Sequence, residues 1–531
     1  MIHENTPAFT RRDLLNMIGT AAGGGAMYQA MTSLGFAAES NFSGPPQLAG
    51  AKKGSSVLIL GAGLAGMVAA LELRNAGYKV TILEYNQRAG GRCWSIRGGD
   101  TFTELGGGVQ HCRFAKGEYF NAGPWRIPYH HYAVLHYCRQ LGVALEPFVQ
   151  VNYNAWVHSS TAYGGKPQRY RHVQADFQGH VAELLGKATR QGSLDSVLTQ
   201  EDKEKLLEGL RRWGALDAEF RYREGIATSA WRGYEIDPGG GLMPSAKPSK
   251  PLEFSELLQS RLWRAIAAGQ AYEFQSTMFQ PVGGMDMIAK AFAGKVGNLI
   301  RYQARVTRIE QNERGVTVTF ADEARGGALQ QEKADWCLCT IPLSILSQID
   351  IQVGAAMQAA INAVPYGSSI KVGLQFKRRF WEEDEHIYGG ITYTDLPISR
   401  ISYPSTRYGA SGPAVVLGAY VFDGPNSFEF GAMAPEERVR RAVEDGSQIH
   451  PQYAHEFDNG MSVAWYRVPG NHGCYGKWTD ALRDQHYKAL CQVDGRIALA
   501  GEHVSHIPAW QEGAILSSLD AIRRLHARAT A

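Results

Sequence analysis

Residues 56–66 read Ser56-Val-Leu-Ile-Leu-Gly61-Ala-Gly63-Leu-Ala-Gly66, a short apolar run that passes directly into a glycine-rich turn. Such a run is typical of a buried parallel strand, and the apolar spacing of residues 67–76 predicts a helix after the turn. Gly61 permits the tight turn, Gly63 lets the backbone approach a pyrophosphate, and Gly66 lets the helix pack against the strand. The stretch therefore predicts the start of a nucleotide-binding β-α-β unit.

A second strand and an acidic residue complete this unit. Gly77 ends the helix, and Tyr78-Lys-Val-Thr-Ile-Leu83 is a strand that runs into Glu84, which can accept hydrogen bonds from ribose hydroxyls. The backbone N–H groups at the start of the helix, around Leu64 and Ala65, suit a phosphate. A glycine-rich turn without a ligand is the alternative, but the elements occur in the order that a Rossmann-like α/β domain requires.

Length and composition narrow the class of protein. A chain of 531 residues exceeds what one hydrophobic core usually organises, so we expect several subdomains with a ligand cleft between them. The composition, 44% hydrophobic and 20% charged, is that of a folded protein, and no apolar run reaches the roughly 20 residues of a membrane span. A formal charge of +3 without a basic stripe argues against nucleic acid as a partner. The seven cysteines predict neither a disulfide framework nor a metal site, and Cys337 and Cys339 alternate with apolar residues as in a buried strand.

The residues after the second strand indicate which dinucleotide is bound. Glu84-Tyr-Asn-Gln-Arg-Ala-Gly-Gly-Arg92 resembles the segment that follows the ribose-binding glutamate in the FAD-binding amine oxidase superfamily. Gly90 and Gly91 let the backbone pass close to a ligand, and Arg92 can place a planar guanidinium on the diphosphate. The resemblance implies an FAD cofactor. It continues to about Ile522, through residues 104–108, 280–285, 306–309, 340–342 and 496–502.

The resemblance also assigns residues to the cofactor. Val306 lies where the superfamily meets adenine, and Gly501 and Glu502 lie where it meets the ribityl chain and pyrophosphate. Gly473-Cys-Tyr475 is similar to the segment that carries covalent FAD in animal monoamine oxidases, but its neighbours differ, so we expect non-covalent FAD. The full set of expected FAD contacts is Gly61, Gly63, Leu64, Ala65, Gly66, Glu84, Arg92, Gly107, Trp125, Val306, Gly501, Glu502, Trp510 and Gln511.

The segment Phe120-Asn-Ala-Gly-Pro-Trp-Arg-Ile-Pro128 indicates the substrate. It resembles the Gly-Pro-x-Arg-x-Pro stretch of L-amino acid oxidases, in which the arginine binds the substrate α-carboxylate through a bidentate pair. That role falls on Arg126, and the flanking prolines and glycine would hold the loop rigid. The alternative is a structural ion pair between Arg126 and a nearby surface carboxylate.

Four more residues of the expected catalytic set follow from the same resemblance. Tyr403 would give the carboxylate a second hydrogen bond, and Lys371 would hold a water near flavin N5. The carbonyl of Ala509 would accept the substrate amine, and the indole of Trp510 would wall the pocket beside the flavin. The alternatives are a solvent-facing position for Lys371 and a plain core position for Trp510.

The implied reaction is oxidative deamination of an L-amino acid. Hydride transfer to flavin N5, with O2 as the final acceptor, would yield a 2-oxo acid, ammonia and hydrogen peroxide. Trp125, Tyr403 and Trp510 favour bulky apolar side chains, whereas Trp231 cannot be placed in the site from sequence. Three alternatives stay open: an oxidase or dehydrogenase for amines without a carboxylate, an L-amino acid monooxygenase, and a flavin-binding partner without turnover.

The first residues resemble an export signal. Thr10-Arg11-Arg12-Asp-Leu-Leu15 precedes a stretch rich in glycine and alanine, as in twin-arginine signals, which export proteins already folded around a cofactor. Two surface arginines before an ordinary helix are the alternative. We expect an exported, periplasmic protein, and the sequence leaves open whether the leader is cleaved.

The expected organisation is an α/β chain with a discontinuous Rossmann-like FAD-binding domain, an α+β substrate-binding domain and a helical subdomain. His130, His131 and His136 have no acid or metal partner near them in the sequence, so we expect them to be structural. The oligomeric state stays open, with a homodimer among the candidates. The expected boundaries are 1–40 for the leader, 55–115, 246–345 and 481–531 for the FAD-binding domain (the middle part with some of the substrate domain), 116–140 for the substrate loop, 141–245 for the helical subdomain and 346–480 for the substrate-binding domain.

Overall fold

The computed structural model of the chain describes residues 40–531. Arg11 and Arg12, on which the expected export signal rests, lie outside the described residues. Within 40–531, no helix combines the length and apolar character that crossing a membrane requires.

A parallel sheet forms the nucleotide-binding half of the molecule. Its strands come from distant parts of the chain and are ordered β14 (Ile300–Arg301), β2 (Lys79–Leu83), β1 (Ser56–Leu60), β18 (Trp336–Cys339), β28 (Ile497–Leu499) and β27 (Val493–Asp494). All pairs are parallel except β27 with β28 at the edge. The buried strand predicted around Cys337 and Cys339 is confirmed as β18, all of whose residues are buried.

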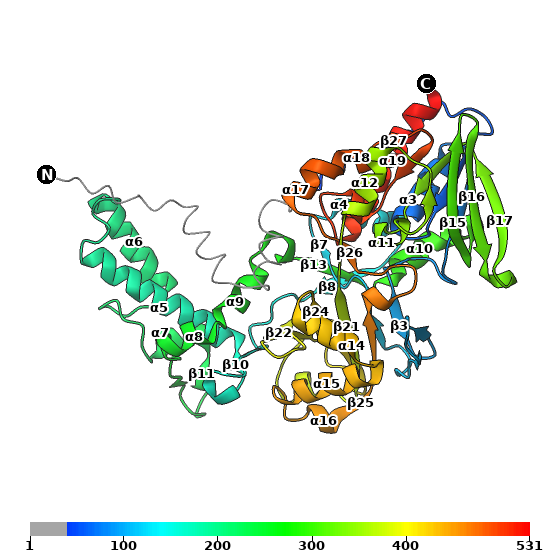
Figure 1. Cartoon of the computed structure of the whole chain (residues 1–531). Coiled ribbons are helices and arrows are strands. Elements are labelled where there is room, and N and C mark those ends of the chain that lie inside the picture. The colour runs from blue at the N-terminus through cyan, green and yellow to red at the C-terminus, as the bar shows by residue number, and fades with distance from the viewer. Residues whose placement is uncertain (1–39) are drawn as a thin grey trace.

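Alternate residues of β1 enter two different cores, as a strand covered on both faces requires. Val57 and Ile59 pack among side chains of α3 (Leu64–Asn75), α10 (Asp286–Val296) and α19 (Gln511–Thr530). Leu58 and Leu60 pack on the other face among side chains of β15 (Ala304–Asn312), β16 (Gly315–Asp322) and α12 (Ala355–Ala363). The nucleotide-binding unit therefore lies between a helical layer and a second small sheet, which Figure 1 shows at its upper right.

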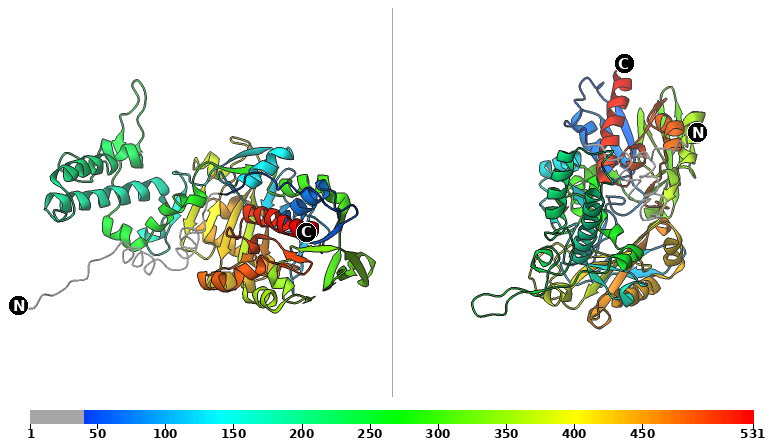
Figure 2. Two further views of the ribbon diagram at one scale, coloured as in Figure 1. Left: turned by 90° about the horizontal axis from the view of Figure 1, so that it is seen from above. Right: turned by 90° about the vertical axis from the view of Figure 1, so that its left-hand side faces the viewer.

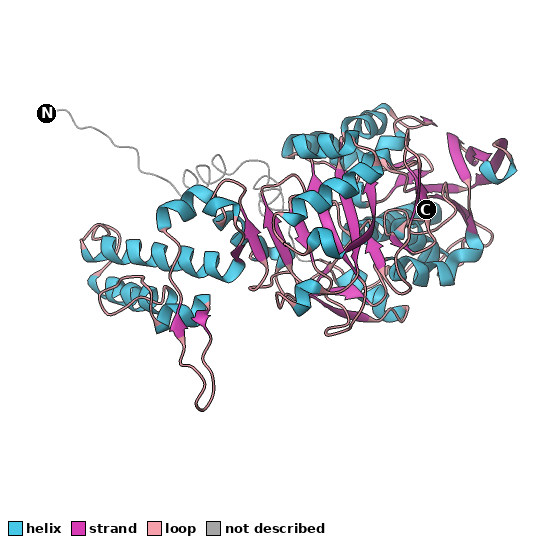
Figure 3. Cartoon of the chain, turned by 90° about the horizontal axis from the view of Figure 1, so that it is seen from below, coloured by secondary structure: helices cyan, strands magenta, loops and turns pink. Residues whose placement is uncertain are grey.

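A second large sheet lies below the first in Figure 1. Its seven strands are ordered β10 (Gln168–Arg169), β9 (Trp156–His158), β22 (Ile391–Thr394), β23 (Arg400–Ser402), β24 (Ala414–Phe422), β21 (Ser369–Phe376) and β25 (Phe457–Ala464). One face packs against α14 (Pro425–Ala432) and α15 (Pro435–Ser447) through an apolar core. Figure 3 shows these strands side by side beneath their helices. The opposite face carries residues of the functional site.

The middle of the chain forms a helical arm. Within residues 141–245, where a helical subdomain is expected, the structure has α5 (Tyr170–Arg190) and α6 (Gln200–Trp213), which pack on each other. Arg232, at the end of α7 (Ile226–Arg232), pairs with Asp176 of α5 at 2.8 Å in the interior of the arm. Figure 2 shows the arm extending away from the two sheets. Trp231 is exposed on this arm and does not line the functional site.

Candidate active site

A cavity of about 570 Å³ is lined by residues of both large sheets. At one end lie the glycine turn after β1, the end of β2 and part of β15. At the other end lie the substrate loop and the inner face of β21 and β24. The cavity thus joins the nucleotide-binding fold to the substrate sheet. Fifteen of the predicted site residues line it: Gly61, Gly63, Leu64, Ala65, Glu84, Arg92, Trp125, Arg126, Val306, Lys371, Gly501, Glu502, Ala509, Trp510 and Gln511.

The glycine turn has the geometry that its sequence predicts. Gly61 has φ +104°, a conformation that disfavours side chains, and a Cβ on Gly66 would lie 2.0 Å from the Gly61 carbonyl oxygen. Gly66 therefore serves close helix–strand packing and does not line the cavity. Gly63 is the N-cap of α3, faces the cavity and has open space where a side chain would stand.

The start of α3 fits a pyrophosphate. Its first turn contains no acidic residue, and its N-cap has no side-chain hydrogen bond, so the leading N–H groups are left for a ligand. Glu84, at the end of β2, is buried and held by hydrogen bonds from the backbone N–H groups of Ala62 (2.7 Å) and Asn86 (2.8 Å). An anion site and a fixed carboxylate at the ends of adjacent strands suit the phosphate and ribose of a dinucleotide.

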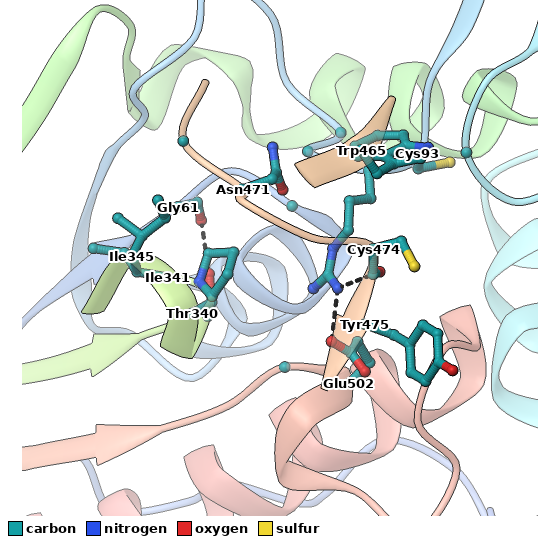
Figure 4. A pocket seen from close by; sticks show the side chains of 18 of the residues that line it. Gly61, Cys93, Thr340, Ile341, Ile345, Trp465, Asn471, Cys474, Tyr475 and Glu502 are labelled. Carbon is teal, nitrogen blue, oxygen red and sulfur yellow. Dashed lines mark hydrogen bonds and ion pairs between the residues drawn. The ribbon is translucent and has the colours of Figure 1, made fainter. Parts of the chain in front are cut away.

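Arg92 and Glu502 form an ion pair at the cavity wall. Arg92 Nη1 lies 2.6 Å from Glu502 Oε1 and donates a second hydrogen bond to the Cys474 carbonyl at 2.9 Å. Glu502 also accepts from the backbone N–H groups of Gly476 and Ala509. Figure 4 marks with dashed lines the two contacts of Arg92, with Glu502 and with the Cys474 carbonyl. The pair joins three segments that are remote in sequence around one part of the cavity.

Arg126 lies at the substrate end of the cavity and is 6% exposed. Its Nη1 donates to the neutral amide oxygen of Gln150 at 2.9 Å. Its guanidinium carbon lies 4.5 Å from the ring centre of Trp125 and 4.4 Å from that of Phe274. The guanidinium is thus held between two aromatic faces inside the protein. The alternative of an ion pair at the protein surface is therefore wrong for Arg126.

Lys371 is buried beneath the substrate loop, which rules out the solvent-facing alternative. Its Nζ donates to the carbonyls of Gly123 (2.6 Å) and Asn121 (3.2 Å) and lies 4.3 Å from the ring centre of Tyr420. Burial, with added repulsion from Arg126 and Arg400, lowers the pKa of Lys371 well below its usual value. Lys371 therefore braces the loop that carries Arg126.

Trp510 forms another wall of the substrate end. Its ring lies 6.2 Å from that of Phe274 and meets the ring of His131 edge-on at 5.0 Å. Ala509, which precedes it, has φ +69°, an uncommon backbone conformation for a residue with a side chain. Such conformations persist where the surroundings impose them, and here the Ala509 N–H donates to Glu502 at 3.1 Å.

The prediction for Tyr403 is wrong. Its side chain is buried in the substrate-domain core and does not line the cavity. The hydroxyl forms hydrogen bonds with Thr392 (2.8 Å) and with His450 (2.7 Å), whose other ring nitrogen meets Glu385 at 2.8 Å. The hydroxyl of Tyr403 is therefore committed to an internal polar chain and not to a substrate.

Gly107 is also misplaced by the sequence prediction. It packs beside the side chains of Glu104 and Arg467 and does not line the cavity, although the neighbouring Leu105 does. The loop that contains Gly107 is therefore near the site, but Leu105 is the residue of this loop that faces the cavity.

Tyr420 and Phe422 line the cavity from β24 and were not predicted from the sequence. They stand two residues apart on one face of a strand, next to Lys371, which is the register partner of Tyr420 in β21. The alternation of these aromatic residues within an apolar strand is the sequence feature that could have predicted their position on one face. Trp465, Cys474 and Tyr475 line the same cavity. Burial raises the pKa of the Cys474 thiol to about 12.

A buried acid lies beside the histidines of the substrate loop. Nε2 of His130 and of His131 lie 3.2 and 3.3 Å from Oε2 of Glu273. The sequence reasoning found no acid partner for them because Glu273 is more than 140 positions away. Hydrogen bonds from these rings, which outweigh burial, lower the pKa of Glu273 to about 2. The three side chains are close enough together to hold a metal ion.

The dinucleotide fold and the two-sheet cavity define a nucleotide-cofactor enzyme, and comparison with known proteins gives its family. A model of the flavin containing amine oxidoreductases matches residues 64–526, so the chain belongs to that family. A flavin cofactor follows from this membership. The anion site at α3 and the fixed Glu84 provide the structural fit for it.

Similar proteins include both amino acid and amine oxidases. The chain is 26% identical over 476 residues to the putative L-amino-acid oxidase YobN of Bacillus subtilis (strain 168), covering 87% of this chain and 93% of that protein. It is 28% identical over 475 residues to the L-amino-acid oxidase of Siganus canaliculatus, covering 88% and 85%. Among solved structures, cyclohexylamine oxidase from Brevibacterium oxydans IH-35A is similar with a TM-score of 0.57 at 15% identity, covering 90% and 99%. This last likeness supports the fold alone.

Proposed function

We propose that the chain is an FAD-dependent L-amino acid oxidase that converts L-amino acids and O2 to 2-oxo acids, ammonia and hydrogen peroxide. The observation that carries the proposal is Arg126, an arginine buried at the far end of the cavity from the nucleotide fold. A guanidinium matches a carboxylate in shape and charge, and a simple amine would give it nothing to bind. The names of the similar Bacillus and Siganus proteins agree with this assignment.

The proposed cofactor is non-covalently bound FAD. The adenosine half would lie along β2 and β15, with Glu84 accepting from ribose hydroxyls and the start of α3 contacting the pyrophosphate. Arg92 and Glu502 would hold the middle of the cofactor. When bound, the flavin accepts a hydride from the substrate and is reoxidised by O2.

The protein's own contribution to the reaction is positioning. Arg126 would pair with the substrate α-carboxylate, and the carbonyl of Ala509 would accept a hydrogen bond from the amine. Trp510, together with Tyr420, would exclude water around the Cα–H bond. Lys371, whose Nζ donates to two carbonyls of the loop, would hold a water in the cavity through its remaining hydrogen-bonding position. Holding the reacting atoms in one geometry is itself a large part of a rate enhancement.

A paired-substrate assay tests the proposal. The purified holoenzyme is given L-leucine or 3-methylbutylamine, which differ by the carboxylate alone, and hydrogen peroxide is measured. We expect kcat/KM to be at least 100-fold higher for L-leucine, because the amine has no carboxylate to accept the charged hydrogen bonds of Arg126. Equal or better turnover of the amine would overturn the proposal.

An amine oxidase without carboxylate recognition is the second candidate. The solved structures similar to this chain include putrescine oxidase, with a TM-score of 0.56 at 17% identity, and cyclohexylamine oxidase. In that case the hydrogen bond between Arg126 and Gln150 would be purely structural. The assay with L-leucine and 3-methylbutylamine distinguishes the amino acid oxidase from the amine oxidase. Detection of an amide product would instead identify a monooxygenase.

We also propose that the protein is exported to the periplasm by the twin-arginine pathway. The support is the Arg11-Arg12 pair in a leader-like sequence, ahead of a fold that binds a cofactor. Fractionation of cells that express the chain with Arg11 and Arg12 intact or replaced by lysine tests this. Periplasmic activity that is unaffected by the double replacement would refute it.

A further inference from the structure

Arg400 shares a sheet face with residues that line the cavity. It is the register partner of Tyr393 in β22, and the neighbouring strands present Lys371 and Tyr420 as a register pair. The guanidinium carbon of Arg400 lies 5.5 Å from the ring centre of Tyr420 and 5.7 Å from that of Phe422. Since both rings line the cavity, Arg400 stands one aromatic side chain away from it.

Arg400 lacks the acidic partner that the enclosed Arg232 and Arg438 have. Its Nε is buried without a hydrogen-bond partner, and no salt bridge among residues 40–531 includes it. By contrast, Arg232 pairs with Asp176 and Arg438 pairs with Glu104, each within 2.8 Å. A partly enclosed guanidinium without an anion is costly, and ring contacts offset only part of the cost. A carboxylate supplied by a ligand would complete the site.

The charges around the cavity favour such an anion. The acidic residues among the described cavity-lining residues are Glu84 and Glu502, and both belong to the nucleotide end. The substrate end carries Arg126, with Arg400 behind it. Repulsion from Arg126 and Arg400, added to burial, lowers the pKa of Lys371. Among the described residues no carboxylate lines the substrate end, and the buried Glu273 behind the loop is already paired with His130 and His131.

The aromatic rings of this region contact cations. Arg400 lies 5.9 Å from the ring centre of Tyr393, and Lys371 lies 5.4 Å from that of Trp125, in addition to the contacts with Tyr420. Ring faces attract cations because of their negative quadrupole. The aromatic residues from which a bulky apolar substrate was predicted therefore also stabilise positively charged side chains.

We propose that the preferred substrates are dicarboxylic L-amino acids, with the α-carboxylate bound by Arg126 and the side-chain carboxylate bound by Arg400. This inference rests on the proposed oxidase function and adds its substrate class. The ring of Trp125 lies 4.5 Å from the guanidinium carbon of Arg126 and 5.2 Å from the ring of Tyr420, which lies 5.5 Å from the guanidinium carbon of Arg400. The two cations thus border one region of the molecule, as a ligand with two anionic ends requires.

The test compares L-glutamate with its neutral isostere L-glutamine, and with L-leucine, in the holoenzyme. We expect kcat/KM for L-glutamate to exceed that for L-glutamine by at least 10-fold. Arg400→Gln should lower kcat/KM for L-glutamate by roughly 10- to 100-fold, the range for a lost charged hydrogen bond, and leave L-glutamine within about 3-fold. Arg400→Lys should retain part of the preference. The matched control is Arg314→Gln, an equal loss of charge in the exposed turn between β15 and β16.

A binding measurement makes the test independent of variant folding. Wild-type holoenzyme is titrated with glutarate, which has two carboxylates, and with pentanoate, which has one, and the flavin spectrum is followed. Tighter binding of glutarate supports the proposal. If L-leucine is oxidised better than L-glutamate and glutarate binds no better than pentanoate, the substrate class is wrong while the oxidase function stands. If no amino acid reduces the flavin, the oxidase function itself fails.

Discussion

Arg92 and Glu502 stand 410 positions apart in the sequence and form an ion pair of 2.6 Å at the wall of the cavity. Arg92 follows the glycine turn of the nucleotide unit, and Glu502 precedes the long helix α19. The pair closes the first and last parts of the nucleotide-binding fold on each other. Both residues line the cavity, so the same contact that stabilises the fold shapes the cofactor site.

Glu502→Gln should release the flavin. The change leaves Arg92, whose side chain is 21% exposed, without its counter-charge. Loss of one partner of a largely enclosed pair costs about 2 kcal/mol when some solvent reaches it. We expect FAD occupancy to fall by at least half in purified protein, measured as the 450 nm absorbance per chain, together with a lower melting temperature.

Asp286→Asn is the matched control for that experiment. Asp286 pairs with Arg97 at 2.7 Å in the same half of the molecule but does not line the cavity. It should lower the melting temperature while flavin occupancy stays near that of the wild type. Equal flavin loss in both variants would mean that Glu502 acts through stability alone.

Arg126→Gln should raise KM for L-amino acids by roughly 100-fold, since a charged bidentate pair contributes about 3 kcal/mol. Flavin content should be unchanged, because Arg126 lies at the substrate end. Arg126→Lys should recover only a small part of the loss, because an ammonium lacks the planar fork. Steady-state kinetics with peroxide detection measure this, and an unaltered KM would remove Arg126 from substrate binding.

Lys371→Met should lower kcat/KM by about 10- to 30-fold, the effect of two lost hydrogen bonds of about 1 kcal/mol each. The bonds to the carbonyls of Asn121 and Gly123 fix the loop on which Arg126 stands. Because the defect is in positioning, the effect should appear mainly in KM. A pure loss of kcat would instead assign Lys371 to the chemical step through its water.

Cys474 should not be bonded to the flavin. Nucleophilic attack by a cysteine requires the thiolate, and burial raises the pKa of this thiol to about 12. Acid precipitation of the holoenzyme should leave the yellow colour in the supernatant, and Cys474→Ser should keep its flavin. A yellow protein pellet would contradict the expectation.

Sequence reasoning located the parts of the site that are built from local segments. The glycine turn, Glu84 and the loop with Arg126 each depend on backbone constraints within about 30 residues, so their spacing is readable. The prediction for Tyr403, which directly follows β23, failed because its position in a motif does not say to which side of the sheet the side chain points. A shift of one residue reverses that side. Gln150, Glu273 and Arg400 were not identified because their partners meet only in the folded chain.

Glu273 should make stability depend on pH in a defined window. The folded protein lowers the pKa of Glu273 from 4.5 to about 2 through its contacts with His130 and His131. A lowered carboxyl pKa stabilises the fold above the unfolded value, and that contribution disappears as pH falls from about 4.5 towards 2. Wild type should exceed Glu273→Gln in free energy of unfolding by up to about 3 kcal/mol at pH 6. Urea unfolding at several pH values should show this difference shrinking below pH 4.5. A difference that is constant with pH would mean that Glu273 contributes through packing and not through its charge.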